Sequence, residues 1–451
     1  MTTTPIWFKW KQPSKIMHDL TAWNDYILDR KILKYDAIWS AGHIKMLYKT
    51  GYMSFDDASL ILDELKNIFH DAQEWNFDFG PEYEDCHSAI EDRLIRKLQD
   101  TGKRIHVWRS RNDQVLLATR LYMRSRLLQY LNSILDLLST LEERIKRDGS
   151  IKISWYTHMQ KAMPSSIGLF LQAFYEHWVE LLERGMNLFE EMNICPFGWA
   201  AWFWVSLDTD KEYTAKILWF HRVVRNPINM NNSRGRYELR ILYFLNEVAG
   251  LMDKFASDIM LWQTAEFWYW TLPAEFSTGS SIMPQKRNLD IVELLRWRSA
   301  KIYWASHEVQ MLLTKLPSSY HRDFQYSKEP FMRADDEIWK MFEMMNLILE
   351  QLIFHKDTLE NSVTPELFTT YAAFRLVAEW VPFREAYVQI AEQYKEWNFN
   401  HTEYRKDFEI IQKKFLDDSK ILWELVKSLN QKISNNTLEI EKISDHIFTL
   451  N

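Results

Sequence analysis

Apolar side chains recur at helical spacing along most of the chain. The clearest stripe consists of Leu245, Val248, Met252, Phe255, Ile259 and Trp262. A second stripe consists of Leu128, Leu131, Leu135 and Leu138. Steps of three and four residues place such side chains on one face of a helix, whereas alternating runs of strand length are scarce. The pattern predicts an all-α protein built around a bundle of long helices, whose seams also suit helices shared between subunits.

Composition narrows the class of protein. The length of 451 residues suggests roughly three domain-sized pieces, and a hydrophobic fraction of 47% supports a sizeable core. A formal net charge of −7 argues against nucleic acid or an acidic membrane as the main partner. Cys86 and Cys195 are the only cysteines, so no disulfide framework is expected and a reducing compartment is the default. Because neither a secretory signal nor a membrane-spanning apolar run is apparent, we expect a soluble cytoplasmic protein.

One segment carries an unusual density of reactive side chains, residues 277–290 with the sequence STGSSIMPQKRNLD. It is rich in hydroxyl groups and small residues, and it ends in a cation, an amide and a helix start. Such a loop can close over a bound anion and expel water, which leaves the Ser280 hydroxyl beside a reacting carbon. Lys286 and Asn288 would then face the developing negative charge. Taken alone, the run also fits a solvated loop that leads into a helix.

Other motifs stand on both sides of this loop. They are residues 85–91 (DCHSAIE), 109–115 (RSRNDQV) and 156–160 (YTHMQ), followed after the loop by 316–325 (LPSSYHRDFQ) and 328–330 (KEP). In this order the segments closely resemble the motifs of the fumarase/aspartase superfamily of lyases. The sequence SSIMPQK is similar to the corresponding motif of the argininosuccinate lyase branch of this superfamily. The resemblance runs from about residue 20 to about residue 400.

The resemblance carries expectations for fold and function. It implies three helical domains at residues 1–105, 106–355 and 356–451, with a long helix bundle in the second. It implies β-elimination of argininosuccinate to arginine and fumarate, in arginine biosynthesis, without a metal or organic cofactor. It also implies a homotetramer whose sites are shared between subunits, each built from three chains. Two alternatives stay open: another fumarate-releasing lyase, such as adenylosuccinate lyase, and a crystallin-like structural protein without turnover.

The family's reaction requires a base, stabilisation of a dianionic intermediate and an acid for the leaving nitrogen. The resemblance assigns catalysis to Ser280, His158, Lys286 and Glu293, with Glu293 paired to His158. Which of Ser280 and His158 takes the proton stays open, and we favour Ser280 as base and His158 as acid. The substrate-binding set implied by the resemblance is His87, Ser110, Arg111, Asn112, Thr157, Asn288, Tyr320, Gln325 and Lys328. In that set Tyr320, Gln325 and Lys328 match positions that hold the amino-acid end of argininosuccinate.

Several of these residues also have a purely structural interpretation. Asp290 and Glu293 have the spacing of a capping box, so Glu293 could merely close a helix N-terminus. Arg109 and Arg111 fit exposed surface charges, although the helix predicted to follow them would offer an anion site at its N-terminus. His158 alone would more often be an ordinary histidine, useful only if its titration near neutrality occurs in a site.

Tryptophan usage departs from the family. The chain has 21 Trp against 11 Gly, whereas glycine ordinarily makes up about 7% of a protein. Tryptophan stands where the resembled motifs carry glycine at Trp39, Trp108, Trp155, Trp202, Trp204, Trp219, Trp268, Trp297, Trp304 and Trp380, and Trp23, Trp75 and Trp397 look similar. Such replacements forbid positive φ angles and force a large ring into a close backbone approach. Our hypothesis is that the organism reads as glycine a stop-type codon that this sequence renders as tryptophan. The alternative is real divergence with compensating cavities.

Overall fold

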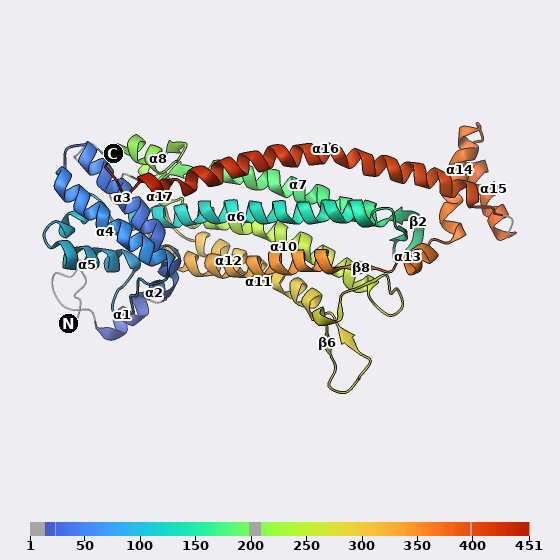
Figure 1. Cartoon of the computed structure of the whole chain (residues 1–451), viewed down its shortest axis with the longest axis horizontal. Helices are drawn as coiled ribbons and strands as arrows, with labels where there is room; N and C mark the ends of the chain where they lie inside the picture. Colours follow the sequence, from blue (N-terminus) through green and yellow to red (C-terminus); the bar gives the residue numbers. More distant parts are fainter. Residues whose placement is uncertain (1–13, 23, 198–208, 397–398, 451) are drawn as a thin grey trace.

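Long helices running back and forth along one axis form the body of the molecule (Figure 1). The computed structural model describes residues 14–22, 24–197, 209–396 and 399–450. The long helices are α6 (Arg111–Asp148), α7 (Ile167–Met192), α10 (Arg236–Trp262), α11 (Asp290–Leu313) and α12 (Lys328–Gln351). Helix α6 packs against α7, α10 against α11, and α11 against α12. The predicted bundle of long helices is confirmed.

A group of shorter helices covers one end of the bundle, at the left of Figure 1. It comprises α1 (Lys15–Ala22), α2 (Asp25–Leu28), α3 (Leu33–Lys49), α4 (Phe55–Gln73) and α5 (Cys86–Leu98), with 3-10 turns at Asp29–Lys31 and Gly102–His106. Two short helices, α8 (Lys211–Ile217) and α9 (Pro227–Asn231), connect α7 to α10. Helix α3 packs on both α4 and α6, which joins this group to the bundle.

The chain after α12 first builds the opposite end and then returns. Helices α13 (Lys356–Ser362), α14 (Thr369–Ala378) and α15 (Phe383–Lys395) form the far group, with a 3-10 turn at Pro365–Phe368. Helix α16 (Thr402–Glu441) then runs back along α6 and α7 to the short α17 (Ile443–His446). Lys45 donates to the carbonyl of His446 at 2.9 Å, and the Phe69 and Phe448 rings lie 5.3 Å apart. The C-terminal segment therefore ties both ends of the bundle together.

Strands are few and short in the described ranges. The longest pair is the antiparallel hairpin of β1 (Lys152–Thr157) and β2 (Gln160–Ser166), beyond the far end of α6. The other pairs are β3 (Ile194–Cys195) with β4 (Arg222–Val223), β5 (Trp270–Thr271) with β8 (Ile353–Phe354), and β6 (Thr278–Gly279) with β7 (Arg287–Asn288). The remaining 3-10 turns are Ala274–Phe276 and Arg322–Ser327. The all-α prediction is confirmed, while the domain boundaries near 105 and 355 stay predictions.

The core follows the apolar stripes of the sequence. The side chains of Leu245, Val248, Met252, Phe255 and Ile259 on α10 are fully buried. On α6, Leu128 and Leu131 are buried, whereas Leu135 is half-buried at the edge of the stripe. Burial of this apolar area is the main favourable contribution to folding. No helix in the described part of the chain is both long and apolar enough to cross a bilayer.

The backbone at several tryptophans has a conformation that suits glycine. Nine non-glycine residues within the described ranges have a positive φ. Five of them are Trp75, Trp108, Trp219, Trp268 and Trp380, with φ between 50° and 68°. Such left-handed backbone is unusual for bulky residues and easy for glycine. Trp39 in helix α3, Trp155 in strand β1 and Trp297 and Trp304 in helix α11 lack this conformation. Trp23, Trp202, Trp204 and Trp397 fall outside the described residues.

Candidate functional site

A cavity of about 820 Å³ lies where the N-terminal helices meet the bundle. Its walls come from α2, the start of α5, the start of α6, the 3-10 turn at Arg322–Ser327 and the start of α12. Seven of the predicted substrate-binding residues line it: His87, Ser110, Arg111, Asn112, Tyr320, Gln325 and Lys328. Segments more than 200 residues apart in sequence therefore form one polar cavity.

The start of α6 supplies the backbone side of this cavity. Ser110 is the N-cap residue of α6, and its hydroxyl accepts from the amide of Asn112 at 3.2 Å. The carboxylate of Asp113 accepts from the backbone amide of Ser110 at 3.1 Å, which completes a capping box. A rigid helix N-terminus of this kind favours negative ligands through its free amides and its dipole.

The arginines beside Ser110 are not free surface charges. Arg109 is only 5% exposed and donates to the Ser40 hydroxyl at 2.9 Å. Arg111 is half-buried and contacts Glu84 at 2.6 Å and Asp85 at 3.4 Å. The structural interpretation of both as exposed charges is therefore wrong. These ion pairs fix the Arg111 guanidinium at the cavity wall.

Lys328 forms the floor of the cavity together with two carboxylates. Its ammonium lies 2.6 Å from Asp29 and 2.8 Å from Asp25, and all three side chains are nearly or fully buried. Burial alone lowers the pKa of Lys328, but Asp29 and Asp25 outweigh it and hold the pKa above its usual value. Burial raises the pKa of Asp25 to about 6, against the opposing charge of Lys328. One cation thus serves two carboxylates, which leaves this corner negative when both are ionised.

Tyr320 and Gln325 also line the cavity. The Arg234 guanidinium lies 5.3 Å from the Tyr320 ring, and the Gln325 amide donates to the carbonyl of Thr21 at 3.1 Å. Arg322 pairs with Glu84 at 2.8 Å. Sequence reasoning missed further lining residues, namely Asp25, Asp29, Glu84, Asp85, Glu91, His106, Val115, Arg234 and Arg322. Asp85, Glu91, Val115 and Arg322 had a signal, because they lie within the quoted segments 85–91, 109–115 and 316–325.

The remaining predicted residues do not line this cavity. Thr157 and His158 are exposed at the tip of the β1–β2 hairpin, at the other end of α6 from Ser110. A helix of 38 residues separates the two groups, a distance of roughly 55 Å at 1.5 Å per residue. Within one chain His158 therefore cannot reach a substrate bound at Ser110.

Ser280 and Lys286 belong to a third location, the hairpin of β6 and β7 that projects from the bundle (Figure 1). Residues 281–287 are exposed, and the Ser280 hydroxyl accepts from the amides of Ile282 and Met283 at 3.3 and 3.1 Å. Asn288 donates to the Thr278 hydroxyl at 3.5 Å across this hairpin.

Glu293 follows the projecting hairpin at the start of α11. The N-cap of α11 is Leu289, without a side-chain cap, so the capping-box interpretation of Asp290 and Glu293 is wrong. Glu293 is exposed, and its carboxylate is therefore not needed to close the helix. The four predicted catalytic residues thus occupy two places, both outside the cavity that holds the seven substrate-binding residues.

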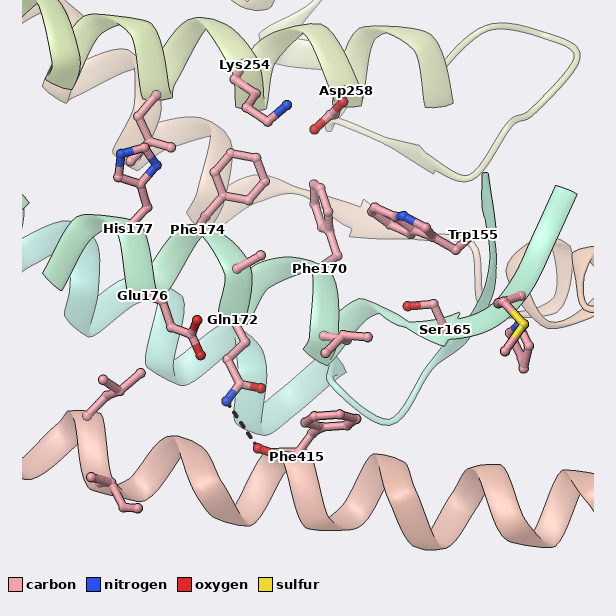
Figure 2. Close-up of a pocket in the computed structure, with 17 residues that line it drawn as sticks. Trp155, Ser165, Phe170, Gln172, Phe174, Glu176, His177, Lys254, Asp258 and Phe415 are labelled. Atoms are coloured by element: carbon pink, nitrogen blue, oxygen red, sulfur yellow. Dashed lines mark hydrogen bonds between the residues drawn. The ribbon is translucent and has the colours of Figure 1, made fainter. Parts of the chain in front are cut away.

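A second cavity, of about 930 Å³, lies between α7, α10 and α16 (Figure 2). Its lining is mostly apolar, with Phe170 and Phe174 in the middle and Trp155 at one end. The Gln172 amide donates to the Phe415 carbonyl of α16 at 3.1 Å. None of the predicted site residues lines this cavity. Four titratable side chains, those of Glu176, His177, Lys254 and Asp258, also line this mostly apolar cavity.

One cluster within the described residues has metal-ligand donor types. Donor atoms of Asp29, Cys86 and His87 lie within 4.8 Å of one another. However, Lys328 already neutralises Asp29 at 2.6 Å, and burial raises the pKa of the Cys86 thiol well above its ordinary value. A protonated thiol is a poor metal ligand, so these residues do not fit a resident metal. The expectation of a reaction without metal stays a prediction.

Comparison with known proteins gives consistent matches. Residues 15–303 match a family model described as a lyase. An argininosuccinate lyase of Thermotoga neapolitana is 36% identical over 393 residues, covering 86% of this chain and 98% of that protein. One of Xylella fastidiosa is 36% identical over 395 residues, covering 87% and 88%.

Solved structures share the fold at lower identity. EDDS lyase in complex with formate superposes with a TM-score of 0.75 at 19% identity, covering 98% of this chain and 97% of that chain. Class II fumarase of Schistosoma mansoni superposes with a TM-score of 0.67 at 14% identity, covering 82% and 89%. These two likenesses concern the arrangement of helices alone.

Proposed function

The chain belongs to the argininosuccinate lyase family, and we propose that it cleaves argininosuccinate to arginine and fumarate by β-elimination. The observation that carries the proposal beyond family membership is the polar cavity at the start of α6. It combines a helix N-terminus, Arg111 and His87 with the acidic corner of Asp25 and Asp29. Cationic groups suit the carboxylates of the substrate, and the acidic corner suits its ammonium or guanidinium.

In the proposed mechanism, Ser280 removes the proton beside the succinyl carboxylate. Lys286 and Asn288 stabilise the charge that develops on that carboxylate, and His158, oriented by Glu293, protonates the leaving nitrogen. A serine is a poor base in water, so the step requires a closed, desolvated site. The exposed loop at 281–287 suits closure over a bound dianion.

We further propose a homotetramer in which different chains complete each site. Three parts of the proposed site lie at separate places on one chain: the seven cavity residues, the β1–β2 tip and the β6–β7 hairpin (Figure 1). A complete site therefore requires residues from several copies of the chain. Apolar side chains on the projecting segments support contacts between copies, because Ile282 is 84% exposed and Met159 is 66% exposed. The apolar cavity beside α16 (Figure 2) suits the same role. A cytoplasmic location is supported by the two free, buried cysteines, Cys86 and Cys195.

Fumarate absorbance tests the reaction directly. We expect release from argininosuccinate and none from adenylosuccinate or aspartate at matched concentrations. Turnover of adenylosuccinate alone would overturn the substrate assignment. No turnover of any of the three by a correctly assembled protein would instead favour a structural role.

Complementation between inactive chains tests the shared site. Ser280→Ala and His158→Asn chains are co-expressed with different affinity tags and purified through both, so that every assembly contains both chains. If Ser280 and His158 of one site come from different chains, roughly a quarter of the sites in a random tetramer receive two intact residues. Each variant alone is the control. Absence of activity in the doubly purified assembly, or an active monomer in sedimentation, would contradict the shared site.

A further inference from the structure

A buried carboxylate outside the cavity lining contacts His87, one of the two histidines among the described residues that line the cavity. Asp36, on α3, is fully buried, and His87, on α5, is 3% exposed. The His87 Nδ1 and Asp36 Oδ2 atoms lie 2.6 Å apart. Asp36 is 51 residues from His87 in sequence, and no motif named above contains it.

The other groups around Asp36 hold its carboxylate in place. The Trp39 indole donates to Asp36 Oδ1 at 2.5 Å. The Ser40 hydroxyl, one turn later on α3, lies 3.4 Å from the same oxygen and itself accepts from Arg109 at 2.9 Å. The second carboxylate oxygen, Oδ2, contacts His87 Nδ1 at 2.6 Å and the Cys86 thiol at 3.7 Å. A carboxylate oriented from its own helix in this way fixes the imidazole ring that it contacts.

This contact determines which ring nitrogen of His87 is left for a ligand. A carboxylate only accepts hydrogen bonds, so Nδ1 must donate, and Nε2 becomes the ring nitrogen available to a ligand. The Nε2 atom has no hydrogen-bond partner among the described residues, although it is buried. An unpartnered buried polar atom is costly, and a ligand group that binds it removes the cost.

The surrounding charges decide whether Nε2 carries a proton. His87 faces Asp36 from α3, Asp29 from the 3-10 turn after α2, and Asp85 and the neutral thiol of Cys86 beside it at the start of α5. Burial lowers the pKa of His87, but Asp36, by its charge and its hydrogen bond, and then Asp85 and Asp29, outweigh burial and raise it. These carboxylates favour the imidazolium form relative to an isolated histidine, and in that form Nε2–H is a charged donor.

We propose that Asp36 is a positioning residue, which holds His87 so that its Nε2–H donates to a carboxylate of the substrate beside Ser110 and Asn112. The inference rests on the proposed function for the identity of the substrate, but the state of His87 is measurable without it. Asp36 itself does not line the cavity, so it acts only through the imidazole.

A purely structural role for Asp36 makes a different forecast. In that case Asp36→Asn would lower stability and leave the remaining folded enzyme with unchanged substrate affinity. Asp335→Asn is a matched control, because Asp335 is an equally buried carboxylate that accepts from Arg126 at 2.7 Å. It does not line the cavity, so it should alter stability without altering the pKa of His87.

Histidine-selective NMR of the intact assembly is the first test, with His87 assigned by the His87→Gln variant. In the wild-type protein we expect an imidazolium at pH 7 whose Nε2 resonance moves on addition of fumarate. In Asp36→Asn the pKa of His87 should fall, although Asp29 and Asp85 remain, and the fumarate-dependent shift should shrink. Asp335→Asn should behave as wild type. An unchanged pKa of His87 in Asp36→Asn, or a wild-type Nε2 insensitive to fumarate, would overturn the inference, whether or not argininosuccinate is cleaved.

Kinetics is the second test. Loss of one charge-assisted hydrogen bond should raise KM for argininosuccinate about tenfold with a smaller change in kcat. The fall of kcat/KM above the pKa of His87 should begin at lower pH in Asp36→Asn. Added to His87→Gln, the Asp36→Asn change should have no further effect on KM, because its path through the imidazole is gone. Additive effects of the two substitutions on KM would overturn the positioning role. If the Asp36→Asn chain is insoluble, the fumarate-dependent shift of Nε2 in the wild-type protein and the kinetics of His87→Gln decide the inference.

Discussion

His158 and Met159 are the two central residues of the turn between β1 and β2, and both have a left-handed backbone, with φ of 52° and 60°. Thr157 pairs with Gln160 across this turn. Two-residue turns with positive φ at both positions are ordinarily filled by asparagine and glycine. The hairpin therefore keeps a strained backbone at the residue proposed to protonate the leaving group, and such strain is typical of functional sites.

Glycine would relieve the backbone strain at either of the two turn residues, but only its substitution for Met159 should leave the reaction intact. Met159→Gly should raise the free energy of unfolding by about 1 kcal/mol, because glycine adopts this conformation freely and the Met159 side chain is exposed. Fumarate release should continue. His158→Gly should relieve similar strain and lose turnover. Thermal midpoints and fumarate absorbance measure both, and a lower midpoint for Met159→Gly would show that its side chain contributes contacts that outweigh the strain.

Much of this architecture was predictable because helical periodicity is a local signal. The apolar stripe from Leu245 to Trp262 predicts helix α10, and all six of its side chains are buried. The cavity set was also found, because each motif keeps its reactive residues within a few positions. The sequence does not predict Asp25, Asp29 and Asp36 as site residues, because an isolated aspartate in a helical pattern resembles an ordinary surface residue. Only the fold brings these carboxylates against Lys328 or His87.

The separation of the site into three places could not be read from residue patterns. Nothing local to His158 or Ser280 shows that α6 and the β6–β7 hairpin hold them away from Ser110. The expectation of shared sites rests on the family resemblance, because the helical seams indicate only that helices can be shared between subunits. The capping-box interpretation at Glu293 failed for a local reason, because α11 begins one residue after Leu289 and Asp290 already lies inside the helix.

The proposed proton-transfer residues give the second prediction. Ser280→Ala should abolish fumarate release from argininosuccinate, and His158→Asn should lower kcat by roughly 10²–10⁴, the usual contribution of a general acid. Thermal midpoints should change little, because both side chains lie outside the buried core. Steady-state kinetics measures the effect, with Ser281→Ala as the neighbouring control. Full turnover by Ser280→Ala would rule out its role as base.

A buried histidine gives the third prediction, on pH. His43 on α3 is fully buried, with Nε2 at 2.7 Å from the carbonyl of Val107. Burial, and secondly the charge of Arg109, lower the pKa of His43 from 6.5 to about 3. Between pH 6.5 and pH 3, His43 is protonated in the unfolded chain and neutral in the folded chain. The contribution of His43 to the free energy of unfolding is therefore complete above pH 6.5 and is lost as pH falls toward 3.

The size of this loss follows from the same shift. As pH falls from 8 to 5, protonation of His43 in the unfolded chain should lower the free energy of unfolding by about 2 kcal/mol. His43→Gln keeps a donor for Val107 and removes the titration, so its urea unfolding curves should depend less on pH by that amount. His70→Gln, at an exposed position on α4, is the control and should leave the pH dependence of the wild type in place. Equal pH dependence in His43→Gln and wild type would show that His43 takes up its proton in the folded state.

The last prediction concerns the tryptophans with a left-handed backbone. Trp108 has φ of 56°, packs edge-on against Tyr52 at 4.1 Å and immediately precedes Arg109 of the cavity. Trp380 has φ of 68° and leaves its indole 94% exposed, so it gains almost no burial in return for the strain. Trp108→Gly and Trp380→Gly should each raise stability by roughly 1 kcal/mol or more. Trp262→Gly, at a right-handed, buried position of α10, should lower it by about 3 kcal/mol.

The origin of these residues can be decided outside the folded protein. If the organism reads a stop-type codon as glycine, the coding DNA should show the standard tryptophan codon at Trp262 and one other codon type at Trp39, Trp108, Trp155, Trp202, Trp204, Trp219, Trp268, Trp297, Trp304 and Trp380. Peptide masses from the native organism should then show glycine at these positions. The glycine version should fold and turn over argininosuccinate better than the literal sequence, because an indole at Trp108 or Trp155 displaces backbone next to the proposed substrate contacts Ser110 and Thr157. Native peptides that carry tryptophan at 108 and 155 would make the decoding hypothesis wrong, and the strained backbone at Trp108 would then be a real feature of the cavity wall.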